Sequence, residues 1–136
     1  MLYVLEMEPM VQEITANAML DALNKDGSIA LNILFETGKS TIEEGSLTIV
    51  DQIFEMLNSN AEIKISIEGH SDNMGIASDN KKLSQDRAKA VMDALVSKGI
   101  VSSRMSYKGW GQEKPVADNS TDEGKSKNRR VEIVKL

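Results

Sequence analysis

One stretch of the chain decides its fold: Ile65-Ser-Ile-Glu-Gly-His-Ser-Asp-Asn-Met-Gly-Ile-Ala-Ser-Asp-Asn-Lys-Lys-Leu-Ser-Gln-Asp-Arg-Ala-Lys-Ala-Val91. Isoleucines alternate with polar residues from Ile63 to Ile67, which predicts a strand with one buried face that ends at Gly69. From Ser84 onward, apolar residues recur three and four positions apart, which predicts an amphipathic helix with Ser84 as its N-cap. The apolar residues of this helix are Ala88, Val91, Met92, Leu95 and Val96.

A polar loop from His70 to Leu83 is expected between the strand and the helix, and it adjoins a candidate binding site. Asp72 follows the end of the strand, and Arg87 lies three residues after the expected cap. Loops on a rigid scaffold commonly carry function, and a helix N-terminus attracts anions. Asp72 would accept from the ammonium of a ligand, while Arg87 and the first-turn amides would hold its carboxylate. The alternatives are a structural Asp–Arg ion pair or two solvated surface charges.

Several short motifs follow one another in a specific order. Around the central stretch they are Gly69-His70-Ser71-Asp72, Asn80, and Leu83-Ser84-x-x-Arg87-Ala88-x-x-Val91. Ile33-Leu34-Phe35-Glu36 precedes them, and Gly109-Trp110-Gly111 and Asn128-Arg129-Arg130-Val131-Glu132 follow. Over about residues 29 to 136, this set resembles the OmpA-like domain. That domain is the peptidoglycan-binding module of outer-membrane proteins, peptidoglycan-associated lipoproteins and flagellar stator proteins.

The resemblance implies that the chain binds the peptide stem of peptidoglycan, chiefly through meso-diaminopimelate. The side chain of that residue ends in an amine and a carboxylate. In the family, the Asp of the strand-end motif and the Arg of the helix motif make the decisive contacts, and these match Asp72 and Arg87. Secondary contacts carry over to Phe35, Asn80, Leu83 and Arg129, with Arg130 as the alternative to Arg129.

Three positions depart from the usual pattern of the family. Ser71 stands where Thr is usual and keeps the hydroxyl, and Glu36 stands where Asp is more usual. Asp79 stands where an aromatic residue often precedes the Asn, which removes an apolar wall of the expected pocket and adds a carboxylate. We therefore expect the binding mode of the family with an altered affinity.

The composition favours one compact domain and excludes several classes of partner. The chain has 136 residues, 40% of them hydrophobic and 27% charged, which is enough to bury a core. Its net charge of −5 argues against nucleic acid or an anionic membrane surface as the main partner. The absence of cysteine excludes disulfides and thiolate chemistry. No cofactor is expected.

The resemblance also implies a place in the cell, the periplasm, in association with the outer membrane and the cell wall. The sequence has no apolar run of transmembrane length and no recognisable signal peptide or lipobox cysteine. We therefore expect a fragment of a larger protein whose export signal and membrane anchor lie outside it. Residues 1–28 are predicted to be an N-terminal extension, with a short strand from Leu2 to Met7 and a helix from Pro9, and residues 29–136 the peptidoglycan-binding domain.

The remaining patterns predict an α/β fold, a two-layer sandwich of helices on a mixed sheet with a βαβαβ core and a final strand. Strands are predicted at Ile29–Phe35, Arg104–Gly109 and around Val131 and Ile133, and a helix around 47–57. The segment 111–127, which is rich in Asn, Ser, Asp, Gly and Pro taken together, is expected to be a long loop with a helical turn near Thr121. Strand–helix–strand units imply partly parallel pairing, with the last strand antiparallel at or near an edge. The order of the strands is left open.

The sequence gives weaker evidence for phosphate binding, catalysis or a metal site. Gly38-Lys39-Ser40 lacks the earlier glycine of a phosphate-binding loop, because position 33 is Ile33. His70 is the sole histidine, and no recognisable nucleophile motif accompanies it, so the chain is not expected to be an enzyme. The spacing of Asp72, Asp79 and Asp86 fits no calcium loop, and no metal site is predicted.

Three hypotheses for function remain. The leading one is a non-catalytic module that tethers a larger envelope protein to the cell wall. The runner-up is a protein-interaction module on the same fold without wall binding, and the third is a cell-wall hydrolase. Trp110, between two glycines, either stacks on sugar or packs under the long loop. The basic cluster of Lys125, Lys127, Arg129 and Arg130 is too small for nucleic acid, but one member would suit a ligand carboxylate.

Overall fold

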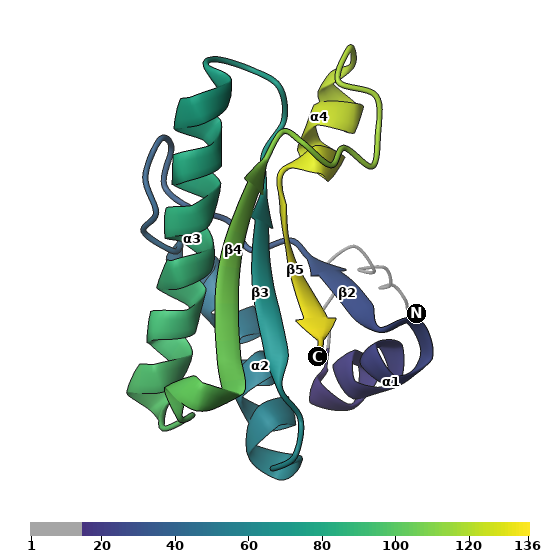
Figure 1. Ribbon diagram of the computed structural model, residues 1–136, viewed down its shortest axis with the longest axis vertical. Helices are drawn as coiled ribbons and strands as arrows, with labels where there is room; N and C mark the ends of the chain where they lie inside the picture. The colour runs from purple at the N-terminus through teal and green to yellow at the C-terminus, as the bar shows by residue number, and fades with distance from the viewer. Residues whose placement is uncertain (1–14) are drawn as a thin grey trace, which may run out of the picture.

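The computed structural model describes residues 15–136. The strand predicted from Leu2 to Met7 and the start of the helix at Pro9 lie outside the described residues. The described chain is an α/β fold in which helices pack on a four-stranded mixed sheet, as predicted (Figure 1).

The sheet has the strand order β2-β5-β3-β4. Its strands are β2 (Ser28–Leu31), β3 (Ile65–His70), β4 (Met105–Gly111) and β5 (Arg130–Lys135). β3 and β4 are parallel, and β5 is antiparallel to both β2 and β3. The final strand is therefore antiparallel to both of its neighbours and lies next to the edge strand β2, so the prediction of an antiparallel strand at or near an edge is confirmed. The alternation of Val131 and Ile133 shows which face is buried, but it does not show how many neighbours the backbone has.

The first strand is shorter than its alternating residues predict. β2 ends at Leu31, and Phe35 instead forms an isolated antiparallel bridge with Ile42. The chain leaves the sheet after Leu31, beside the start of β5, where Leu31 is paired with Val131. This departure brings Phe35 towards α3 (Ala77–Lys98), where its ring meets an arginine side chain.

Three helices supply one layer of the sandwich. α1 (Ala16–Asp26), α2 (Leu47–Ser59) and α3 pack together with the strands around a single core, and short 3-10 helices occupy Glu44–Ser46 and Ser102–Arg104. α1 contributes Met19 and Leu23, which are fully or almost fully buried. The other core side chains include Val50, Ile53, Leu57, Ile65, Ile67, Val91, Leu95 and Ile133. The division of the chain at residue 28 stays a prediction.

α3 begins at Ala77, seven residues earlier than Ser84, so the prediction of a loop up to Leu83 and of Ser84 as N-cap is wrong. Ser84 is instead buried within the helix, where its hydroxyl donates to the Lys81 carbonyl (2.8 Å) and accepts from the Gly111 N–H (2.9 Å). A Cβ on Gly69 would lie 2.2 Å from the Ser84 carbonyl oxygen. The first turns of α3 are polar and show no apolar stripe, and close packing on glycine backbone holds this part of the helix against the sheet.

The long loop after β4 is organised by a short helix, α4 (Asp122–Asn128). Its N-cap is Thr121, whose hydroxyl accepts from the Gly124 N–H, so the helical turn predicted near Thr121 is confirmed. The side chain of Asn128 is fully buried and accepts from the N–H groups of Val116 and Ala117. α4 and the start of β5 stand at the same end of the molecule as the C-terminal end of β3 (Figure 1).

Candidate functional site

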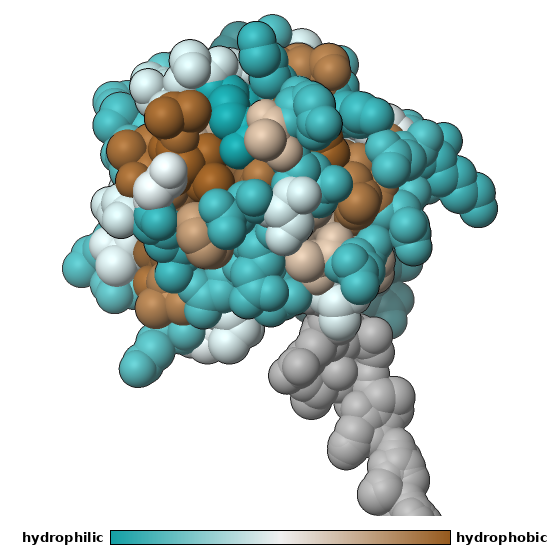
Figure 2. Space-filling view, turned by 90° about the horizontal axis from the view of Figure 1, so that it is seen from below, coloured by the Kyte–Doolittle hydropathy of each residue, from teal (hydrophilic) through white to brown (hydrophobic). Residues whose placement is uncertain are grey.

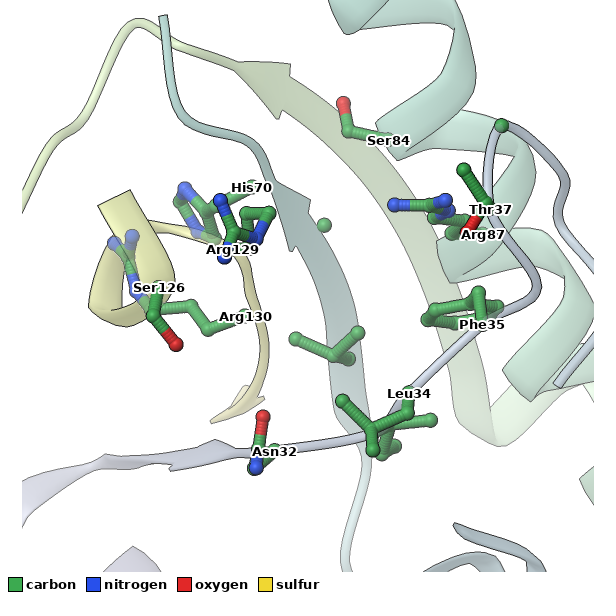
Figure 3. A pocket seen from close by; sticks show the side chains of 14 residues that line it. Asn32, Leu34, Phe35, Thr37, His70, Ser84, Arg87, Ser126, Arg129 and Arg130 are labelled. Atoms are coloured by element: carbon green, nitrogen blue, oxygen red, sulfur yellow. The ribbon is translucent and has the colours of Figure 1, made fainter. Parts of the chain in front are cut away.

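A cavity of about 340 Å³ lies where the C-terminal end of β3, the chain after β2, α3 and the α4–β5 junction meet. Thr37, Phe35 and Arg87 stand on one side of it, and Ser126, Arg129 and Arg130 on the other (Figure 3). Of the six residues predicted from the sequence, the structure places Phe35, Arg87 and Arg129 in its lining. Asp72, Asn80 and Leu83 are not among the described residues that line it.

Arg87 reaches the cavity from the middle of α3 and is held by the loop after Phe35. Its Nε donates to the Lys39 carbonyl (2.9 Å) and its Nη2 to the Glu36 carbonyl (3.5 Å). The guanidinium carbon lies 5.0 Å from the centroid of the Phe35 ring, a cation–π arrangement. Partial burial lowers the pKa of Arg87 below its usual value, and the positive charge of Arg129 lowers it further. The group nevertheless remains cationic at any physiological pH.

The prediction that the N-terminus of the helix assists Arg87 is wrong. Because α3 begins at Ala77, Arg87 is ten residues into the helix. At a rise of about 1.5 Å per residue, the free N–H groups of the first turn are roughly 15 Å away along the axis. The other positive groups that line the cavity are Arg129, which is the C-cap residue of α4, and Arg130, which begins β5.

Asp72 pairs with Arg129 and not with Arg87 among the described residues. Its Oδ2 accepts from the Nη1 of Arg129 at 2.5 Å, and its Oδ1 accepts from the Met74 N–H at 3.0 Å. The side chain of Asp72 is 10% exposed, whereas that of Arg129 is 50% exposed. Asp72 therefore lies behind the wall of the cavity and holds one of the cations that line it.

Asn80 and Leu83 lie on α3 next to the loop that carries Asp72. The Nδ2 of Asn80 donates to the Met74 carbonyl (2.6 Å) and lies 3.5 Å from the Oε1 of Gln112. Leu83 is half-buried. In the structure Asn80 thus ties the loop after β3 to the helix that follows it.

A second cavity of about 520 Å³ adjoins the first. Asn32, Ser126, Arg129 and Arg130 line both, so Arg129 stands between two hollow regions. Asn32, Thr37 and Ser126 were missed by sequence reasoning, because single polar residues in loops and on short helices show no pattern that distinguishes them. Tertiary packing alone brings them to the site.

His70 and Arg130 form a buried polar cluster at the end of β3 and the start of β5, where they are register partners. Arg130 donates to the Glu132 carboxylate (2.6 Å) and to the carbonyls of Lys114 (3.0 Å) and Asn128 (3.3 Å). His70 has a side chain 2% exposed, and its ring nitrogens have no hydrogen-bond partner among the described residues. The pKa of His70 is lowered from 6.5 to about 4, chiefly because burial disfavours the charged ring and secondly because Arg130 is close.

Trp110 belongs to the face of the sheet that the helices leave uncovered. A Cβ on Gly109 would meet α3, so the neighbouring side chains of β4 point the other way. The Trp110 Nε1 donates to the Glu68 carboxylate (2.7 Å), and the ammonium groups of Lys108 and Lys114 each lie 3.8 Å from the ring centroid. These contacts hold Trp110 within a polar cluster of this face.

The end of the molecule away from the cavity exposes several apolar side chains. Figure 2 shows apolar side chains gathered on one side of this end, among hydrophilic ones. Val96 and Val101, near the C-terminal end of α3, are 42% and 59% exposed. Such side chains cannot form hydrogen bonds, so the cavity between Arg87 and Arg129 is the better candidate for recognising a small polar ligand.

The family model described as the OmpA family matches residues 34–129, a span that contains the cavity and Asp72. The chain belongs to the OmpA family.

Relatives of this OmpA-family chain are proteins of the bacterial envelope. Over 105 residues it is 37% identical to outer membrane porin F of Pseudomonas aeruginosa, covering 76% of this chain and 30% of that protein. Over 102 residues it is 35% identical to the peptidoglycan-binding protein ArfA of Mycobacterium bovis, covering 75% and 31%. The crystal structure of the peptidoglycan-associated lipoprotein from Burkholderia pseudomallei is 28% identical, with a TM-score of 0.68, covering 82% of this chain and 92% of that one.

The chain spans about a third of the length of these curated relatives. Within residues 15–136, no helix is long and apolar enough to cross a membrane. The same residues contain no group of three or more His, Cys, Asp or Glu side chains arranged to hold a metal ion.

Proposed function

We propose that this OmpA-family domain binds peptidoglycan without catalysis, through the meso-diaminopimelate of the stem peptide, and so tethers a larger envelope protein to the cell wall. The observation that carries the proposal is the convergence of Arg87 and Arg129 on one cavity, with Asp72 directly behind Arg129. Two guanidinium groups beside one carboxylate suit a ligand that ends in both a carboxylate and an ammonium.

The cavity offers free hydrogen-bond donors for the carboxylate of such a ligand. Both hydrogen bonds of Arg87 within the described structure use Nε and Nη2, so Nη1 keeps its two N–H groups. Among residues 15–136, Arg129 uses Nη1 for Asp72, which leaves its Nε and Nη2 for a ligand. The Phe35 ring under Arg87 supplies an apolar wall for the methylene groups of the ligand. Asn80 and Leu83 would act by holding the loop that carries Asp72.

The proposed setting is the periplasm, next to the outer membrane and the cell wall. Support comes from the relatives, which include an outer membrane porin and a peptidoglycan-binding protein. The protein-interaction module on the same fold is the second candidate. Asp79 favours it, because an exposed carboxylate stands in the first turn of α3 close to the loop that carries Asp72.

The test is co-sedimentation of the domain with purified sacculi that contain diaminopimelate. We expect Arg87→Ala and Asp72→Ala to lose about tenfold or more in affinity, because each removes a charge-assisted hydrogen bond. Lys89→Ala is the matched control: it removes one positive charge from α3, where Lys89 pairs with Asp93 at the surface, and it should sediment like the parent.

Sacculi that carry lysine in place of diaminopimelate should bind weakly, because lysine lacks the second carboxylate. Full sedimentation of both the Asp72 and Arg87 variants would show that the assigned site is wrong. A parent protein that stays in the supernatant would favour the interaction module, and release of soluble muropeptides on incubation would point to a hydrolase.

A further inference from the structure

We propose that Arg129 determines the selectivity of this site by exchanging partners. In the free protein Arg129 donates a hydrogen bond to the Asp72 carboxylate. When the ligand binds, its ammonium replaces Arg129 at Asp72, and Arg129 turns to the carboxylate of the same ligand. The Asp72–Arg129 ion pair of the free protein then makes the site selective for a ligand whose side chain ends in both an ammonium and a carboxylate. This inference rests on the proposed function and specifies how its two charged groups are recognised.

Both oxygens of the Asp72 carboxylate already accept a hydrogen bond within the described structure. One oxygen is bound by Arg129 and the other by the Met74 N–H, and the side chain is almost completely buried. Asp72 also does not line either of the two cavities around Arg129 in the described structure. An ammonium group that enters from the cavity therefore meets the Arg129 guanidinium before it reaches the outer oxygen of Asp72.

Arg129 has the freedom to make this movement, and its neighbour Arg130 shows the contrast. The side chain of Arg129 is 50% exposed, lies between two cavities, and has Asp72 as its hydrogen-bond partner among the described residues. The side chain of Arg130 is 8% exposed and donates to Glu132, Lys114 and Asn128. Arg130 also lines both cavities, but its hydrogen bonds anchor it, while the half-exposed Arg129 has one ion pair to exchange.

The exchange favours a zwitterion because every charged group then has a partner of opposite sign. A ligand with an ammonium and a carboxylate replaces one ion pair, Asp72–Arg129, with two, and no charge is left alone. A simple amine gains Asp72 but leaves the Arg129 guanidinium without its partner, which offsets the gain. The ion pair of the free protein therefore acts as a competitor that lysine-type stem peptides cannot displace efficiently.

The experiment compares Arg129→Gln with the parent by calorimetric titration of two stem tripeptides, one with meso-diaminopimelate and one with L-lysine at the third position. For the diaminopimelate peptide we expect the variant to bind about tenfold more weakly, the size of one lost charge-assisted hydrogen bond. The lysine peptide should bind the variant more tightly than the parent, because Asp72 is then free. Opposite signs for the two ligands are the signature of the exchange.

Lys127→Gln is the matched control, since it removes the same charge two residues earlier on α4 at the rim of the second cavity. It should weaken both peptides slightly and equally, if at all. Equal weakening of both peptides by Arg129→Gln, or no change in either, would overturn the exchange while leaving wall binding intact. A parent protein that binds neither peptide would overturn the proposed function and this inference with it. Thermal unfolding of each variant verifies that it is folded.

Discussion

The buried ring of His70 makes the stability of this domain depend on pH in a way that one substitution can isolate. Its pKa is about 4 in the folded protein against an ordinary value of 6.5, because burial and the nearby Arg130 disfavour the charged form. Lys114 acts in the same direction, while Glu132 and Glu68 oppose the shift without cancelling it. Since His70 is the chain's single histidine, its titration can be followed without overlap.

The direction follows from which state binds the proton more tightly. Between pH 6.5 and pH 4 the unfolded chain holds a proton on His70 that the folded protein does not, so acidification favours unfolding. A difference of 2.5 pKa units corresponds to about 3 kcal/mol, which is fully lost once the pH falls below about 4. This loss is a substantial part of the stability of a domain of this size.

The perturbation is His70→Gln, which keeps a polar side chain but removes the titration. Urea unfolding of parent and variant at several pH values between 7 and 4 gives the free energy of unfolding of each. The carboxylates titrate in both proteins, so the difference between the two isolates His70. We expect the variant to gain on the parent by about 3 kcal/mol as the pH falls from 7 to 4. A difference that does not vary with pH, or an NMR titration of the imidazole with its midpoint near 6.5, would refute the reasoning.

Two further predictions concern the packing that supports the site. Gly69→Ala should destabilise the protein by about 3 kcal/mol, because its Cβ would lie 2.2 Å from the Ser84 carbonyl oxygen, and the urea midpoint measures the loss. Gly45→Ala is its control, with no atom within 4 Å of the added methyl group, and an equal effect of both would contradict the close approach of β3 and α3. Asn128→Ala should cost about 3 kcal/mol, because the buried amide bonds both the N–H and the carbonyl of Ala117. Hydrogen exchange of the Ala117 N–H should accelerate markedly, and unchanged protection would show that this anchor is dispensable.

Three of the six site residues predicted from the sequence line the cavity. Arg87, Phe35 and Arg129 were identified through motifs, and all three line one cavity. Asp72 was expected beside Arg87, but in the structure it pairs with Arg129. The partner of a charged side chain depends on which backbone ends are brought together, and residues 72 and 129 meet only because β3 and β5 are neighbours.

The sequence by itself determined the type and order of the main elements. The alternation of Ile65 and Ile67, and the three- and four-residue spacing of Val91 and Leu95, each follow from burying one face of a strand or a helix, which is a local property. Turn and cap residues such as Thr121 likewise act on atoms a few positions away.

Only the tertiary structure decided where β5 inserts and where α3 begins. β5 pairs on both sides in the middle of the sheet, and the polar first turns of α3 are held by contact with the glycine backbone of β3 and β4. Both outcomes depend on hydrogen bonds and steric fit between segments far apart in the chain, which periodicity does not encode. The same non-local pairing of β3 with β5 brings Arg129 to Asp72. The proposed exchange, and the selectivity that would follow from it, depend on this ion pair.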